Sequence, residues 1–294
     1  ALQYRPSANL SFGLDALYGT LDSDRGEFHL QSRGSSSTAL GCTGADYEGA
    51  RYYCSSLTDI EFNANNEVIY SAWENTALHS ESRDQSATTD ISQMVFNADW
   101  TVTEALSVSG LLGYMKSEYE SNSAKVYLES FADMTIDYRE DRFYGTNSYV
   151  NGFDPTDIDE YRFHEIDLAE DKVDNSFAIA KLDSDYLLSD TSTLKFGVSI
   201  KDFEHSNNSE QIGNALRSEW QSGEISDVIN PDLVYVNNVH EKQSWLSTDV
   251  TGVLTTFNVD RNLSYSDQPD EVTEQTTALY ITYEKDFLLE NSEV

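Results

Sequence analysis

The chain has 294 residues, with 18 Lys and Arg residues against 52 Asp and Glu residues and a formal net charge of -34. This acidic balance excludes nucleic acid as an expected partner, because phosphate binding requires clustered Lys and Arg, and it disfavours anionic inner-leaflet lipid. The length suits one large β domain or two small domains, and no run of about 18 apolar residues predicts a transmembrane helix.

One pattern recurs along the chain. It consists of an aromatic residue, a short polar turn, and then Leu-x-(Phe or Val)-x-Gly or a close variant. It occurs in the stretches YRPSANLSFGLDALY (4–18), WTVTEALSVSGLLGYMKSEY (100–119) and YLLSDTSTLKFGVSIKDF (186–203). The segment FLLENSEV (287–294) is similar to the beginning of a fourth such turn.

The residues on either side of these turns alternate between apolar and polar. In 194–200 the even positions are Leu, Phe, Val and Ile, whereas the odd positions are Lys, Gly and Ser. The stretches MVFNADW (94–100), FAIAKLDSDY (177–186) and TALYITYEKDF (277–287) alternate in the same way. Period-two alternation of this kind predicts half-buried strands. We therefore expect antiparallel hairpins with turns of about four to five residues.

The connections at the opposite ends of these hairpins are much longer, at about 60, 50 and 65 residues. Loops of this length are uncommon in compact soluble domains. Short turns at one end and long loops at the other are typical of outer-membrane barrels. Within the long connections, 59–82 predicts a hairpin that bends at an Asn pair, and 123–131 and 232–239 predict strands that extend beyond the membrane.

The pattern favours lipid against the apolar side of 194–200, with its Lys and Ser side facing a barrel lumen. Trp100, Tyr186 and Phe287 directly precede the turns, where one aromatic girdle is expected. Tyr18 and Tyr114 are in phase with a second girdle. The alternative is a soluble β-sandwich whose core contains the same apolar residues, because alternation alone does not distinguish lipid from a protein core.

Two cysteines, Cys42 and Cys54, lie in a polar stretch rich in Gly and Ser, with no metal-site pattern nearby. We expect a local disulfide, which contributes about 3 kcal/mol in the loop-entropy model and implies an oxidising compartment. The alternative is two unpaired thiols.

The stretches 1–28, 96–121 and 182–206 resemble the barrel portion of a TonB-dependent outer-membrane receptor, of the group typical of Xanthomonas- and Caulobacter-like bacteria. The resemblance implies an all-β fold, an antiparallel transmembrane β-barrel of about 22 strands with short periplasmic turns and long extracellular loops. The chain would supply about seven of these strands. The sequence shows no plug domain, no energy-coupling box and no terminal strand ending in an aromatic residue. Residues 1–294 are therefore expected to form part of one β-barrel domain.

The same resemblance implies a function in the bacterial outer membrane. We expect a segment of a receptor that takes up a nutrient, an oligosaccharide or a siderophore, with energy from the TonB complex acting through a plug. The expected partners are outer-membrane lipid, that energy-coupling complex and a small-molecule or oligosaccharide ligand. Two alternatives stay open: a passive porin or adhesin-like barrel, and a soluble secreted β-rich binding module.

Motifs for catalysis are absent from the sequence, which contains no G-x-S-x-G, G-x-x-x-x-G-K-[ST], H-E-x-x-H or C-x-x-C. We therefore expect no enzyme. The five histidines are dispersed without ligand spacing, and each is expected on the surface or in a loop. No cofactor is expected apart from Ca²⁺, which the acidic run 154–174 could hold through hard carboxylate oxygens. The candidate ligands are Asp154, Asp157, Asp159 and Glu160, and the alternative is a solvated loop.

Aromatic residues in the long connections are the candidates for ligand contact. Flat rings among polar neighbours suit stacking on sugars and amphipathic ligands. The alternative is that these rings pack the loops together. The candidates are Trp73, Tyr144, Tyr149, Trp220 and Trp245.

Overall fold

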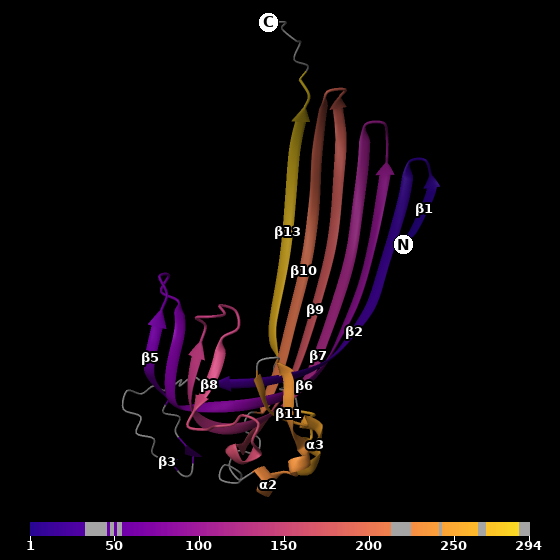
Figure 1. Cartoon of the computed structure of the whole chain (residues 1–294). Helices are drawn as coiled ribbons and strands as arrows, with labels where there is room; N and C mark the ends of the chain where they lie inside the picture. The colour runs from indigo at the N-terminus through magenta and orange to yellow at the C-terminus, as the bar shows by residue number, and fades with distance from the viewer. Residues whose placement is uncertain are drawn as a thin grey trace.

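The computed structural model describes residues 1–32, 46–47, 50–51, 55–212, 225–240, 243–263 and 269–287. The protein is built on one large antiparallel sheet, which confirms the all-β prediction (Figure 1). Seven strands form its main path, in the order β1-β2-β6-β7-β9-β10-β13. Their bounds are β1 (Leu2–Ser7), β2 (Leu10–Ser32), β6 (Val68–Thr101), β7 (Leu106–Asp137), β9 (Arg162–Ser189), β10 (Ser192–Ile212) and β13 (Asp270–Lys285).

The turns predicted from the sequence lie together at one end of this sheet (Figure 1). They comprise residues 8–9, 102–105 and 190–191, so two of the three are shorter than expected. In the longest turn, the hydroxyl of Thr103 accepts hydrogen bonds from the backbone N–H groups of Ala105 and Leu106. The fourth turn, expected after Phe287, falls outside the described residues.

Much of the sequence assigned to long connections continues the sheet. β6 has 34 residues and β7 has 32, so both strands run far beyond the alternating stretches near the turns. The hairpin predicted over 59–82 is confirmed: β5 (Ser56–Phe62) pairs with the first part of β6, and Asn66 turns the chain with a φ of 62°. The strand predicted over 123–131 lies within β7, and β8 (Thr146–Val150) pairs with the end of β7.

A strand is confirmed over most of 232–239, but the expectation that it extends a membrane strand is wrong. β11 (Val234–His240) pairs with β12 (Gln243–Thr248) in a separate two-stranded sheet and does not extend the main one. Another small hairpin joins β3 (Asp46–Tyr47) to β4 (Ala50–Arg51). Short helices accompany these strands: η1 (Ile158–Glu160), α2 (Ile225–Val228), η2 (Pro231–Leu233) and α3 (Val250–Phe257).

The helix α3 has ordinary capping signals at both ends. A carboxylate oxygen of Asp249 accepts a hydrogen bond from the backbone N–H of Gly252 at 3.0 Å, which satisfies one N-terminal donor. Asn258 ends the helix in the left-handed region, with a φ of 51°. No helix in the described part of the chain is long and apolar enough to cross a membrane.

We call residues 225–240 and 243–263 the covering segment, because they pack on the ends of the long strands away from the turns (Figure 1). There, apolar side chains of β7 and β9 meet α2, β12 and α3 in the main core. Its buried members are Ala124, Val126, Leu128, Tyr161, Phe163, Ile166, Leu168, Ile225, Ile229, Leu246, Val250, Val253 and Leu254.

Candidate functional site

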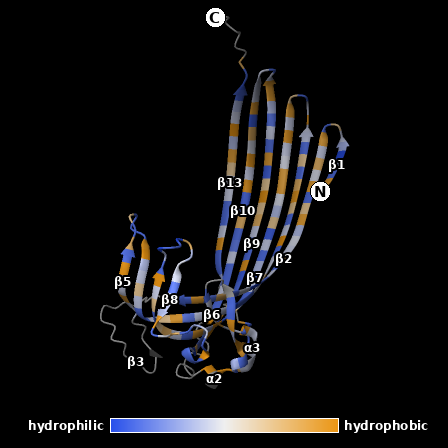
Figure 2. Ribbon diagram, in the orientation of Figure 1, coloured by the Kyte–Doolittle hydropathy of each residue, from blue (hydrophilic) through white to orange (hydrophobic). Residues whose placement is uncertain are grey.

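The strand register defines two faces of the main sheet. Directly paired residues of antiparallel neighbours lie on the same side, and side chains alternate along each strand. The first face carries Phe196 with its partners Ser184 and Ile281, and the second carries Lys195 with Asp185 and Thr282. The predicted alternation therefore runs in phase across neighbouring strands, and Figure 2 shows hydrophobic residues recurring along them.

An apolar band covers the first face near the turns. Its larger members are Leu10, Phe12, Leu14, Tyr18, Met94, Phe96, Trp100, Leu106, Val108, Leu112, Tyr114, Leu182, Tyr186, Leu194, Phe196, Val198, Ile200, Leu279, Ile281 and Tyr283. No Asp, Glu, Lys or Arg interrupts this band among the described residues. No described element covers it either, and Leu279 and Ile281 are 79% and 73% exposed.

The far edge of the apolar band crosses the sheet obliquely. On β2 the band ends at Tyr18, because the next residues on the first face are Thr20, Asp22 and Asp24. The row of residues paired with Tyr18 ends at Thr273 on β13. On β13 the last apolar residue of that face is Leu279, six residues from Thr273. Six residues span about 20 Å along a strand, and the five strand spacings between β2 and β13 span about 24 Å. The edge of the band therefore makes an angle of about 40° with the direction in which the strands pair. The strands are tilted by the same angle from the line perpendicular to that edge.

The second face of the same strands is mainly polar and bears ion pairs. The Lys181 ammonium lies 2.8 Å from an Asp183 carboxylate oxygen, and Lys195 lies 2.8 Å from Glu284. The hydroxyl of Tyr280 donates to Asp183 at 2.7 Å. One face of these strands is therefore continuously apolar, whereas the other carries hydrogen-bonded charges.

Farther from the turns the first face is covered. Between the band and this region it becomes polar, because Lys116, Glu118 and Glu204 occupy its rows. Beyond them, the hydroxyl of Ser82 accepts a hydrogen bond from the backbone N–H of Thr248 at 2.8 Å.

Two further contacts hold the covering segment on this face. The guanidinium of Arg261 lies 3.1 Å from a carboxylate oxygen of Asp84. A carboxylate oxygen of Glu170 accepts from the backbone N–H of Leu263 at 3.0 Å. Hydrogen bonds and the apolar core together fix the covering segment on the strands.

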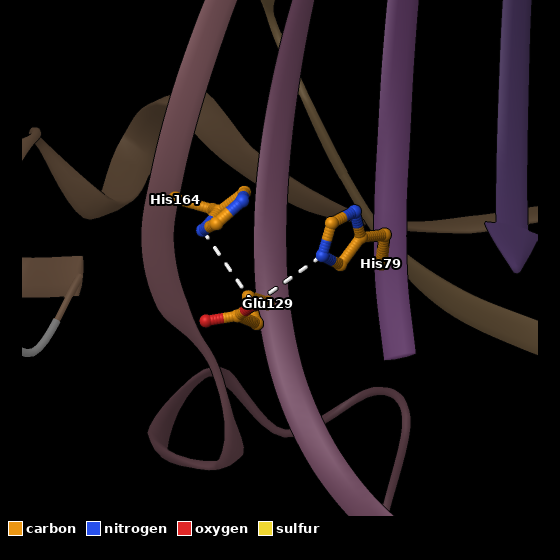
Figure 3. A group of neighbouring side chains, drawn as sticks. All are labelled: His79, Glu129 and His164. Atoms are coloured by element: carbon orange, nitrogen blue, oxygen red, sulfur yellow. Dashed lines mark hydrogen bonds and ion pairs between the residues drawn. The ribbon is translucent and has the colours of Figure 1, made fainter. Parts of the chain in front are cut away.

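The second face of this distal region holds a cluster of His79, Glu129 and His164 (Figure 3). These residues come from β6, β7 and β9, and all three are buried, with exposed fractions of 3%, 5% and 1%. One carboxylate oxygen of Glu129 lies 3.3 Å from His79 Nε2 and 3.5 Å from His164 Nδ1. The two imidazole rings are 4.7 Å apart between centroids.

A β-bulge places His164 in this cluster. His79 and Glu129 are a directly paired couple of β6 and β7. On β9, however, Glu165 pairs with Tyr127 and Phe163 pairs with Leu128, so His164 is the extra residue between them. A bulge of this kind redirects side chains. It sends Phe163 into the apolar core on the first face and leaves His164 beside Glu129 on the second.

The surroundings of the cluster are acidic. A carboxylate oxygen of Glu165 lies 3.6 Å from the other ring nitrogen of His164, Nε2. Burial, together with the nearby carboxylates of Glu81 and Asp167, raises the pKa of Tyr127. Lys125 is a nearby cation, and its ammonium lies 3.7 Å from Glu81.

The expectation that every histidine lies on the surface or in a loop is wrong for His79 and His164. Both lie in long strands and are almost fully buried. Their separation of 85 positions in the sequence gives no ligand spacing, because the pairing of three strands and the bulge bring them together. The sequence predicts strands over 59–82 and 123–131, which contain His79 and Glu129, but it predicts none around His164.

The predicted ligand-binding aromatics do not form one group. Trp73 and Tyr149 both pack against the small core of Leu78, Ala132 and Met134. The hydroxyl of Tyr149 accepts a hydrogen bond from the Gln243 side-chain amide at 2.7 Å, and burial raises its pKa to about 12.

The remaining three aromatic candidates differ in accessibility. Tyr144 is 62% exposed, whereas Trp245 is buried on β12, which favours a packing role for its ring. Trp220 lies outside the described residues. Cys42 and Cys54 lie outside them as well, so the expected disulfide stays a prediction.

The predicted Ca²⁺ ligands Asp154, Asp157, Asp159 and Glu160 are all exposed. A carboxylate oxygen of Asp154 accepts from the backbone N–H of Thr156 at 2.8 Å and from its hydroxyl at 2.7 Å. These hydrogen bonds lower the pKa of Asp154. Asp157 caps η1 by accepting from the backbone N–H of Asp159 at 3.0 Å. Both residues thus order their own loop, and Ca²⁺ binding stays a prediction.

Comparison of the chain with models of protein families, with curated proteins and with solved structures finds no match.

Proposed function

We propose that the chain is part of an outer-membrane β-barrel, in a receptor that takes up a nutrient with energy from the TonB complex. The oblique apolar band carries this proposal. Strands of outer-membrane barrels tilt by about 35–45° from the membrane normal. The boundary of the lipid-facing residues must therefore run obliquely to the rows of paired residues, because the lipid layer is planar and the strands are tilted in it. The slope of about 40° derived from the register has the expected size.

The height of the band supports the same proposal. On β7 its first-face residues run from Leu106 to Tyr114, eight positions apart. Eight positions span about 27 Å along the strand, which a tilt of about 40° reduces to about 21 Å. The apolar band of outer-membrane barrels is about 25 Å tall, with aromatic girdles at both edges. Trp100 and Tyr186 lie at the turn edge, and Tyr18 and Tyr114 lie at the far edge.

The two faces of the sheet have the polarity that such a barrel requires. The uncharged band would contact lipid, and the face with Lys181, Asp183 and Lys195 would line the lumen. A soluble module is disfavoured, because residues such as Leu279 and Ile281 stay largely exposed in the described part of the chain. The turn end would be periplasmic, and the distal region with its covering segment would be extracellular.

The energy-coupled receptor and the 22-strand barrel rest on the sequence resemblance, and the ligand follows from it as an oligosaccharide or a siderophore. The distal region offers rings for contact with such a ligand. Tyr144 and Phe143 are 62% and 84% exposed. Accessible rings next to hydrogen-bonding side chains suit amphipathic ligands.

Cell fractionation combined with uptake measurements tests the proposal. We expect the protein in the outer-membrane fraction, released only by detergent. Uptake of labelled oligosaccharides and siderophores by cells with and without the gene should identify a ligand, and a protonophore should abolish that uptake. Uptake that persists with the protonophore would favour a passive porin. A protein recovered in soluble form without detergent would overturn the membrane assignment.

A further inference from the structure

We propose that His79, Glu129 and His164 bind one divalent transition-metal ion, with Zn²⁺ as the best match. This inference does not depend on the proposed transport function. It rests on three donor side chains from three neighbouring strands, whose ligand atoms all lie within 4.8 Å of one another (Figure 3).

The separations match those of metal ligands, and His79 Nε2 also lies within hydrogen-bond distance of Glu129. The carboxylate oxygen of Glu129 is 3.3 Å from His79 Nε2 and 3.5 Å from His164 Nδ1. Hydrogen bonds between charged nitrogen and carboxylate groups are shorter, at about 2.7–2.9 Å. Ligands about 2.0–2.1 Å from a tetrahedral Zn²⁺ are about 3.3–3.4 Å from one another. Both separations from the Glu129 oxygen are close to this ligand–ligand distance, and the ligand atoms of the two histidines lie within 4.8 Å of each other.

The donor set has the chemistry that such an ion prefers. Two imidazoles and one carboxylate suit Zn²⁺ and other first-row transition metals, whereas Ca²⁺ and Mg²⁺ prefer sites made of oxygen donors. Three protein ligands leave a fourth position for water or another group. The ring nitrogen of each histidine that faces Glu129 is Nε2 for His79 and Nδ1 for His164, and either nitrogen can bind a metal.

Glu165 would orient one of the two ligands. Its carboxylate oxygen lies 3.6 Å from His164 Nε2, on the opposite side of the ring from Glu129. A carboxylate behind a metal-bound histidine fixes the ring and raises its basicity, and losing such a partner typically weakens metal binding about 10- to 100-fold. Glu165 is thus assigned a positioning role.

The local charge favours a cation. Glu81, Glu165 and Asp167 surround Tyr127, which is two residues from Glu129, and Lys125 approaches Glu81. Carboxylates buried together are unfavourable unless cations compensate them. A divalent ion would supply positive charge where β6, β7 and β9 meet. The competing explanation is that protonated histidines supply it, and the experiment below distinguishes the two.

Metal content and coordination test the assignment on the full protein, after stripping with a chelator and incubation with equimolar Zn²⁺. We expect about one Zn²⁺ per chain after desalting. X-ray absorption at the zinc edge should show imidazole nitrogen and carboxylate oxygen as ligands, without sulfur. A spectrum with sulfur ligands, or without imidazole, would overturn the assignment even if the ion is retained.

Variants locate the ion. His79→Ala and His164→Ala should each lower Zn²⁺ affinity at least 100-fold, and Glu165→Gln should lower it about 10- to 100-fold. His205→Ala is the matched control, because His205 lies in β10 of the same sheet with its Nδ1 2.8 Å from the Asn175 side-chain oxygen. The control should keep full affinity.

Folding must be verified for each variant by circular dichroism. Glu129→Gln keeps the side-chain volume and serves if an alanine variant does not fold. Its amide oxygen is a much weaker ligand, so Zn²⁺ binding should still fall at least tenfold. If folded Glu129→Gln and His79→Ala bind Zn²⁺ as tightly as the unaltered protein, or if the unaltered protein retains none, the cluster is a hydrogen-bonded network only.

Discussion

Replacing Leu112 by Arg tests which face of the sheet contacts lipid. Leu112 belongs to the first face, where it pairs with Phe96 and Ala180, and its side chain is 56% exposed. It lies inside the apolar band, next to the central first-face position of the stretch from Leu106 to Tyr114 on β7. An Arg on the lipid face of a barrel costs about 2–4 kcal/mol near the bilayer midplane. That range corresponds to a loss of roughly 30- to 700-fold in the folding equilibrium.

Leu111→Arg is the matched control, because Leu111 occupies the second face beside Asn97 and Lys181. There the new guanidinium would meet polar groups and, in the proposed barrel, water. We expect its cost to be much smaller than that of Leu112→Arg. The assay is urea-induced unfolding of the protein in phosphatidylcholine vesicles, followed by tryptophan fluorescence. Equal costs for the two variants, or a larger cost for Leu111→Arg, would refute the assignment of the faces.

Three further predictions concern packing. Phe163→Ala should lower the free energy of unfolding by about 3–5 kcal/mol. Phe143→Ala, at an 84% exposed position, should change it by less than about 0.5 kcal/mol. Similar values for the two variants would contradict the core described for the distal region. Gly197→Val should cost about 1–3 kcal/mol, because any Cβ there collides with the ring of Tyr280; an unchanged denaturation midpoint would show that this ring moves aside freely. Ser82→Ala removes the acceptor of the buried Thr248 backbone N–H and should cost about 1–3 kcal/mol of stability. Limited proteolysis should then cleave the covering segment faster. An unchanged cleavage rate would refute the role of Ser82 as an anchor of that segment.

The sequence predicts the main strands near the turns well because their signal is local. Alternation in 94–100, 177–186 and 194–200 has a period of two, and it requires only one buried or lipid-facing side. Each of these stretches is a strand in the expected phase. The positions of the turns follow from the same pattern, although two of them are shorter than expected.

The distal region could be predicted only in part. The hairpin over 59–82 and the strand over 123–131 follow from the sequence, whereas the covering segment and the histidine cluster depend on partners far away in the sequence. Residues 83–86 (RDQS) contain no apolar residue that would mark a strand, yet they lie in β6 because β7 pairs with them. The helix α3 contains β-branched residues and Gly252, which lower helix propensity, although Asp249 before it is a recognisable capping signal. The cluster around Glu129 requires a bulge, and no residue type in 162–166 marks one.

The unbroken ladder between β6 and β7 has a consequence for how this chain tolerates insertions. From Thr101 to Thr76 the two strands stay in register without a shift, so the apolar band and the distal region share one phase. Inserting one residue midway along β7 would exchange the two faces of everything beyond it. Leu128 would then point towards the histidines, and Glu129 would enter the apolar core. Stretches that look like variable loops in the sequence should therefore accept substitutions far more readily than single-residue insertions or deletions.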